Sequence, residues 1–219
     1  MPALFPRWTN AAARGSLLAL AVLAIGIPTA LMVWVRTSYA TGEHAVVTQP
    51  VPFDHRVHTH ALRIDCRHCH FTAEVAPSAG LPPTAACIGC HNSALLNSAT
   101  FAPVRASIAS QKPIEWRRVN ALPDFVFFNH SIHLAKGIGC ESCHGRVDQM
   151  GQVSQATTLS MGWCLDCHRD PVRHVRPRSE VTAMGWDATH VGPATDSLRR
   201  RLAHDYNVRS FTNCTTCHR

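Results

Sequence analysis

The hydrophobic pattern is most pronounced near the start of the chain, where Ser16 to Val35 form an uncharged, mostly apolar run of 20 residues. A helix of about 20 residues is long enough to cross the hydrocarbon core of a bilayer. Arg7 and Arg14 precede the run and Arg36 follows it, which weakly favours a cytoplasmic N-terminus. We therefore predict a single transmembrane helix over residues 16–36, with residues 53–219 on the periplasmic side.

A cleaved signal peptide is the alternative interpretation, because Ser38-Tyr39-Ala40 loosely resembles a cleavage site. The apolar region of a signal peptide has only about 7–15 residues, and this run is longer. The prediction is therefore a retained anchor in the inner (cytoplasmic) membrane. It follows a cytoplasmic tail of residues 1–15 and precedes a linker of residues 37–52.

The remainder of the chain has no sustained hydrophobic periodicity. No long alternation of apolar and polar residues predicts a sheet, and prolines and glycines recur throughout. We expect short helices and irregular loops over residues 53–219. Hydrophobic residues make up 46% of the 219 residues, but the richest run lies before residue 36, so this domain has few apolar residues for a core. Cofactors or cross-links usually compensate for such a deficit.

The ten cysteines all belong to one repeated pattern, C-x-x-C-H. Two thiols at this spacing can reach the two vinyl groups of one haem, and the following histidine lies where it can bind the iron, so the pattern indicates c-type haem attachment. Zinc-ribbon or disulfide pairing would explain the cysteines but not the five histidines. We predict five covalently bound haem c groups. The attachment cysteines are Cys66 and Cys69, Cys87 and Cys90, Cys140 and Cys143, Cys164 and Cys167, and Cys214 and Cys217.

Each motif histidine is the expected proximal iron ligand: His70, His91, His144, His168 and His218. Further histidines lie in an internal repeat, F-x-H-x-x-H, that occurs at residues 53–58 and 128–133, before the first and third motifs. On a helical turn, histidines at i and i+3 point to similar faces at different heights and can serve two haems. This arrangement resembles the cytochrome c3/c7 (class III) family. The resemblance implies that His55 and His58 bind haems 1 and 2, and His130 and His133 bind haems 3 and 4.

The sixth ligand of the fifth haem is open. His204 lies 10 residues before Cys214, as His130 does before Cys140, in a stretch that we expect to form a short helix. Other histidines could replace it, and a methionine thioether would raise the potential. These alternatives are His174, His190, Met150, Met161 and Met184.

Longer strings resemble the pentahaem cytochrome c subunit (ActA) of bacterial alternative complex III. They are Lys112-Pro-Ile-Glu-Trp-Arg-Arg-Val119, Phe127-Phe-Asn-His-Ser-Ile-His133 and Met161-Gly-Trp-Cys-Leu-Asp-Cys-His-Arg169. The resemblance covers roughly residues 50–170 and implies haem modules at residues 53–91 and 128–168, with a C-terminal haem at 196–219. It also implies a non-catalytic subunit that relays electrons to a periplasmic acceptor. The implied partners are an iron–sulfur subunit, multi-span quinol-binding subunits and a monohaem cytochrome c.

The formal net charge of +7 would suit a nucleic-acid-binding protein, but no reader motif is present and the domain is expected outside the cytoplasm. Two other functions remain open. A self-sufficient quinol dehydrogenase of the NapC/NrfH type also has one membrane helix and several haems. However, its first haem follows the anchor closely, whereas Cys66 lies 30 residues after the apolar run. A multihaem reductase would need an open iron position, which only the fifth haem could offer.

Overall fold

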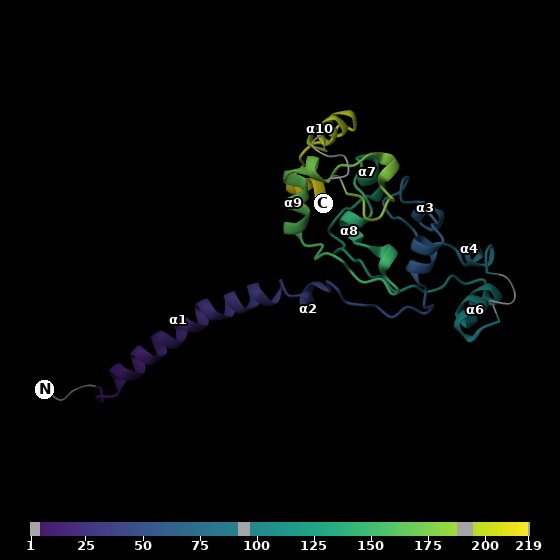
Figure 1. Cartoon of the computed structure of the whole chain (residues 1–219). Coiled ribbons are helices and arrows are strands. Elements are labelled where there is room, and N and C mark those ends of the chain that lie inside the picture. The colour runs from purple at the N-terminus through teal and green to yellow at the C-terminus, as the bar shows by residue number, and fades with distance from the viewer. Residues whose placement is uncertain (1–4, 92–96, 188–194, 219) are drawn as a thin grey trace. The chain divides into compact units, whose positions relative to one another are not determined.

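The computed structural model describes residues 5–91, 97–187 and 195–218. The chain divides into two compact units, Met1–Gly42 and Glu43–Arg219. Figure 1 shows one long helix, α1, and a second unit of short helices joined by loops.

The first unit is dominated by α1 (Thr9–Trp34), a 26-residue helix with no buried residue. Its length and mean hydropathy of 2.3 are sufficient for a membrane crossing, although a signal sequence can pass the same test. The helix begins before the apolar run that predicted it, at Thr9. At its end, the Arg36 guanidinium donates a 2.7 Å hydrogen bond to the Met32 carbonyl oxygen. A short helix, α2 (Ser38–Thr41), follows and ends at Gly42, whose φ of 73° is left-handed.

The second unit consists of short helices, as expected. In chain order they are η1 (Arg56–Ala61), α3 (Cys66–Cys69), α4 (Thr84–Ile88), η2 (Ala99–Phe101), α6 (Ala102–Ser110), α7 (His130–Ala135), α8 (Glu141–His144), η3 (Val147–Gln149), α9 (Met161–Arg169), η4 (Pro171–His174), η5 (Arg178–Glu180), α10 (Thr195–Asp205) and α11 (Cys214–Cys217). Within the described ranges the extended segments form only isolated bridges, such as Val126 with His218 and Ile138 with Val175.

The buried apolar core of the second unit is small. In the described part of the chain, only Val51, Ala73, Val104, Val175, Val181 and Ala203 are buried hydrophobic residues. No aromatic side chain and no leucine belongs to that set. A core of this size stabilises a domain of this length poorly, so the fold requires other apolar bulk. This agrees with the scarcity of apolar residues in the sequence.

A buried ion pair holds one long loop against the third motif. Arg176 donates a hydrogen bond of 2.9 Å to the Glu141 carboxylate, and both side chains are largely buried. The second carboxylate oxygen of Glu141 accepts a hydrogen bond from the backbone N–H of Gly185. The Arg176 guanidinium also lies 4.9 Å from the centre of the Trp186 ring. Residues 176–186 are therefore attached to the helix that carries the third motif.

Candidate haem-binding sites

Each C-x-x-C pair lies in or directly beside a short helix. Cys140 is the residue before α8, and Cys90 lies in the turn that follows α4. The helices α3 and α11 consist of the four residues of one motif, and α9 contains the whole of the fourth motif. Because residues i and i+3 share a helix face, the two thiols of a motif point to the same side. Asp65 caps α3 by accepting a 2.8 Å hydrogen bond from the Arg67 backbone N–H. The Arg67 side chain also bonds this carboxylate and lowers the pKa of Asp65 to about 2.

The internal repeat of the sequence is also a repeat of side-chain geometry. Phe53 stacks on His58 at 4.2 Å and meets His55 edge-on at 4.7 Å. In the second copy, Phe128 stacks on His133 at 4.5 Å and meets His130 edge-on at 4.7 Å. The phenylalanine of each copy thus sets the ring orientation of both histidines. The sequence pattern includes this residue, but its contacts with the two rings are seen only in the structure.

Three of the predicted ligand pairs face each other across a narrow gap. The ring centres are separated by 6.1 Å for His58 and His91, 6.3 Å for His130 and His144, and 6.2 Å for His133 and His168. An imidazole nitrogen lies about 2 Å from a bound metal and about 1 Å from its own ring centre, so two imidazoles on opposite sides of one metal have centres about 6 Å apart. These separations therefore fit an iron held between two histidines, as in a haem.

The first motif has a similar neighbour. His55 lies close enough to His70 for their charges to interact. Burial, with a smaller contribution from His70, lowers the pKa of His55 to about 4. Burial likewise lowers the pKa of His144 to about 4. Both rings are therefore neutral near pH 7, and a neutral imidazole is the form that binds a metal.

Backbone carbonyl groups orient most of these rings by accepting a hydrogen bond from Nδ1. Such a bond fixes the tautomer and leaves Nε2 free for a metal. The donor–acceptor pairs are His58 with Asp54 (2.8 Å), His70 with Gly80 (2.8 Å), His130 with Pro77 (2.7 Å), His133 with Asn129 (2.7 Å), His168 with Phe211 (3.0 Å) and His218 with Phe125 (3.3 Å).

The remaining three rings differ from this pattern. His144 Nδ1 lies 3.2 Å from the side-chain amide of Asn120, whose Oδ1 has no other partner. With the amide turned over, Oδ1 accepts the Nδ1–H bond of His144. The sequence carried no signal for Asn120, because it lies 20 residues before the third motif in a loop. The buried Nδ1 atoms of His55 and His91 have no hydrogen-bond partner within the described residues.

The fifth motif lacks a matching partner in the described part of the chain. His218 packs against Phe125, with 5.7 Å between ring centres. The predicted ligand His204 lies on α10 with its side chain 90% exposed, and its Nδ1 is 3.3 Å from Asp205. Within the described residues, His218 makes no ring contact or hydrogen bond with His174, Met150, Met161 or Met184, and His190 lies outside those residues. The sixth ligand of this site thus stays a prediction.

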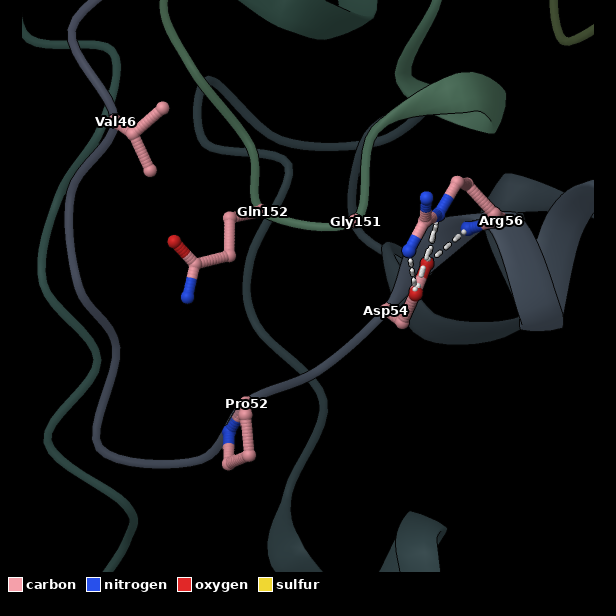
Figure 2. A pocket seen from close by; sticks show the side chains of 6 residues that line it. All are labelled: Val46, Pro52, Asp54, Arg56, Gly151 and Gln152. Carbon is pink, nitrogen blue, oxygen red and sulfur yellow. Dashed lines mark hydrogen bonds and ion pairs between the residues drawn. The ribbon is translucent and has the colours of Figure 1, made fainter.

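Within the described residues, the cysteines and histidines form neither a disulfide nor a cluster for a bare metal ion. All ten cysteines are free, so none is used in a disulfide. Among the described residues, no three His, Cys, Asp or Glu side chains converge to hold a bare metal ion. A separate hollow lies between the linker and residues 151–152, beside the Asp54–Arg56 ion pair (Figure 2). Its lining contains no motif cysteine or histidine, so it is distinct from the candidate haem sites.

Comparisons with known proteins agree with this geometry. Residues 126–219 match the family model of cytochrome c7 and related cytochrome c. Over 97 residues the chain is 37% identical to the menaquinone reductase, multiheme cytochrome c subunit, of Nitratidesulfovibrio vulgaris (strain Hildenborough). The match covers 44% of this chain and 45% of that relative. The chain therefore carries a multihaem cytochrome c7-like domain, a family in which haem c is covalently bound.

Proposed function

We propose that this chain is the electron-transfer subunit of a membrane quinol:acceptor oxidoreductase of the alternative complex III type. It would relay electrons from an iron–sulfur subunit through five haem c groups to a periplasmic acceptor. Its partners would be that subunit, multi-span quinol-binding subunits and a monohaem cytochrome c. The N-terminal helix would hold it in the inner membrane.

The proposed ligand set follows the motifs and the ring pairs. His70 and His55 would bind the first haem iron, His91 and His58 the second, His144 and His130 the third, and His168 and His133 the fourth. His218 would be the proximal ligand of the fifth, with His204 as its candidate partner. A haem with two histidine ligands exchanges single electrons and has no free iron position for a substrate. The chain would therefore carry electrons without itself being an enzyme.

The observation that carries this proposal is the set of three imidazole pairs with ring centres 6.1–6.3 Å apart, each next to a C-x-x-C helix. The phenylalanines and the backbone carbonyl groups hold these rings in place. Such preorganisation limits rearrangement when the electron count changes, which suits electron transfer better than substrate binding.

The function is tested by affinity purification of this subunit from detergent-solubilised membranes. The expected result is a stoichiometric complex with iron–sulfur and multi-span subunits, in which added quinol reduces the haems within a single turnover. A lone subunit that oxidises quinol would instead support the NapC/NrfH type. Tight binding of carbon monoxide to several of the reduced haems would contradict closed, two-histidine sites.

A second candidate is electron flow in the opposite direction, towards the quinone. The name of the relative from Nitratidesulfovibrio vulgaris, a menaquinone reductase subunit, favours it. The same purified complex separates the two directions. Oxidation of a reduced periplasmic cytochrome by added menaquinone supports quinone reduction, whereas reduction of the oxidised cytochrome by quinol supports quinol oxidation.

A further inference from the structure

We propose that the five haem sites, numbered by their motifs, lie in space in the order 2–1–3–4–5, so that sites 2 and 5 form the ends of the row. The order rests on the ligand assignment of the proposed function and adds to it the route that electrons take. It differs from the order along the chain, in which site 1 would be an end and site 2 would adjoin site 3.

Sites 1 and 2 are neighbours because one helical segment supplies a ligand to each. His55 directly precedes η1 and faces His70, while His58 lies in η1 and faces His91. Their thiols are also close together. Cys87 lies near enough to Cys69 for the two side chains to interact.

Site 1, and not site 2, adjoins site 3. The sulfur atoms of Cys66 and Cys140 lie within hydrogen-bond reach of each other. The loop held by the Arg176–Glu141 ion pair joins the two motifs. The Cys140 N–H donates a 2.8 Å bond to the Val181 carbonyl oxygen, and Cys66 Sγ lies 3.9 Å from the next carbonyl, that of Thr182.

A second contact joins the same two sites from the side of the distal ligands. The backbone N–H and Nδ1 of His130 both donate to the Pro77 carbonyl oxygen, at 3.1 and 2.7 Å. Ser131 N–H donates to the Ala76 carbonyl oxygen at 3.3 Å. Residues 76–77 belong to the loop that follows the first motif, so the start of α7 is anchored beside site 1.

The row continues through sites 3, 4 and 5. The helix α7 carries His130 of site 3 and His133 of site 4. The fifth motif is tied to the fourth by its preceding loop, because Ser210 Oγ donates a 2.7 Å bond to the His168 carbonyl oxygen and His168 Nδ1 donates to Phe211. Thiol neighbours follow the same order, since Cys143 interacts with Cys167, and Cys164 with Cys217.

Site 2 has a different surrounding from the inner sites. His91 packs on Phe101 at 4.8 Å, and Thr84 Oγ1 lies 2.6 Å from Ser107 Oγ of α6. Of the ten cysteines, only Cys90 of motif 2 and Cys214 of motif 5 are exposed. Both ends of the proposed row therefore reach the protein surface, where a partner could exchange electrons.

The order is tested by redox titration of the purified complex. One haem is altered by a ligand substitution, and the number of other haems whose midpoint potentials shift is counted. A methionine ligand raises the potential of its own haem, so that haem is reduced first. Its extra electron then lowers the midpoint potentials of adjoining haems only. We expect His58→Met, at site 2, to lower one other midpoint and His55→Met, at site 1, to lower two. The chain order 1–2–3–4–5 predicts the reverse counts, two and one, which would overturn the proposal.

Matched variants guard against loss of folding. His91→Met and His70→Met replace the opposite ligands of the same two sites and should give the same counts, one and two. A near-infrared thioether–iron band identifies the altered haem in each variant. If haem content is unchanged and this band is absent from all four, the ligand assignment fails and the order fails with it. Quinol-driven reduction of the unmodified complex tests the proposed function, and the titrations of the variants test the order. Failure of one proposal can therefore be distinguished from failure of the other.

Discussion

At the scale of single residues, the candidate ligand histidines differ in what their Nδ1 atoms contact. Most donate Nδ1–H to a backbone carbonyl group, which no substitution can remove, whereas His144 depends on the side chain of Asn120. A hydrogen bond from the non-ligating nitrogen makes an imidazole a stronger donor to its metal. A stronger donor stabilises the oxidised iron and lowers the potential. Asn120 is therefore a side chain through which the potential of the third haem can be changed without touching a ligand.

We expect Asn120→Leu to raise one of the five midpoint potentials while the low-spin spectrum stays unchanged. A hydrogen bond of about 1 kcal/mol corresponds to a shift on the order of 40 mV for one electron. The matched variant Asn120→Asp introduces a stronger acceptor and should lower the same midpoint. The measurement is a redox titration of the purified complex, and equal midpoints in both variants would contradict a role for Asn120.

At the scale of elements, the two copies of F-x-H-x-x-H reach similar ring geometry from different backbones. The first copy leads into a π-helix, η1, and the second begins an α-helix, α7. In each copy the side chain of the residue before the first histidine accepts a hydrogen bond from a backbone N–H of the following turn. Asp54 accepts from the Arg56 N–H at 2.9 Å, and Asn129 accepts from the Ser131 N–H at 2.9 Å. The same residues accept the Nδ1–H of the second histidine through their carbonyl groups.

We expect Asn129→Ala to destabilise the haem domain by about 1 kcal/mol, because α7 loses its N-terminal cap. The change should also broaden the titrations of two haems, since α7 carries two candidate ligands. Guanidinium unfolding, followed by loss of the low-spin absorption, measures the free energy. Asn129→Asp keeps an oxygen that can cap the helix and should remain within a few tenths of a kcal/mol of the parent. An Asn129→Ala variant as stable as Asn129→Asp would show that the cap has no such role.

At the scale of the whole molecule, α1 exposes its apolar side chains and the second unit buries few of its own. The helix α1 buries none of its residues, which a lipid environment would explain. The second unit has six small buried apolar residues in its described part, which five macrocycles would supplement. A membrane around α1 and covalently bound haems in the second unit would together supply the missing apolar surroundings.

Mass spectrometry of the membrane-bound subunit should therefore detect the anchor and the haems together. We expect peptides from residues 16–36 and five haem groups on the ten cysteines. Carbonate washing should leave the subunit in the membrane fraction. A protein that starts near residue 41 and is released by carbonate would instead show that the apolar run is a signal peptide.

The sequence alone determined the features that depend on local spacing. The C-x-x-C-H motifs and the F-x-H-x-x-H repeats require only one or two helical turns, so their geometry follows from residue order. The short helices and the poor apolar core were predictable for the same reason. Spacing alone does not settle the role of His204. Its offset from Cys214 equals that of His130 from Cys140, its side chain is 90% exposed on α10, and its role as a ligand stays a prediction.

Only the tertiary structure decided which motifs meet. The contact of Cys66 with Cys140 joins residues 74 positions apart, and Asn120 reaches His144 from a loop without any motif. The loop of residues 176–186 is tied to the third motif by the Arg176–Glu141 ion pair and to the first by the contact of Cys66 with the Thr182 carbonyl oxygen, and no periodicity marks that loop. Local spacing acts through one turn of backbone, whereas these contacts depend on how distant loops pack. The candidate sites could therefore be proposed from the sequence, whereas their order in space could not.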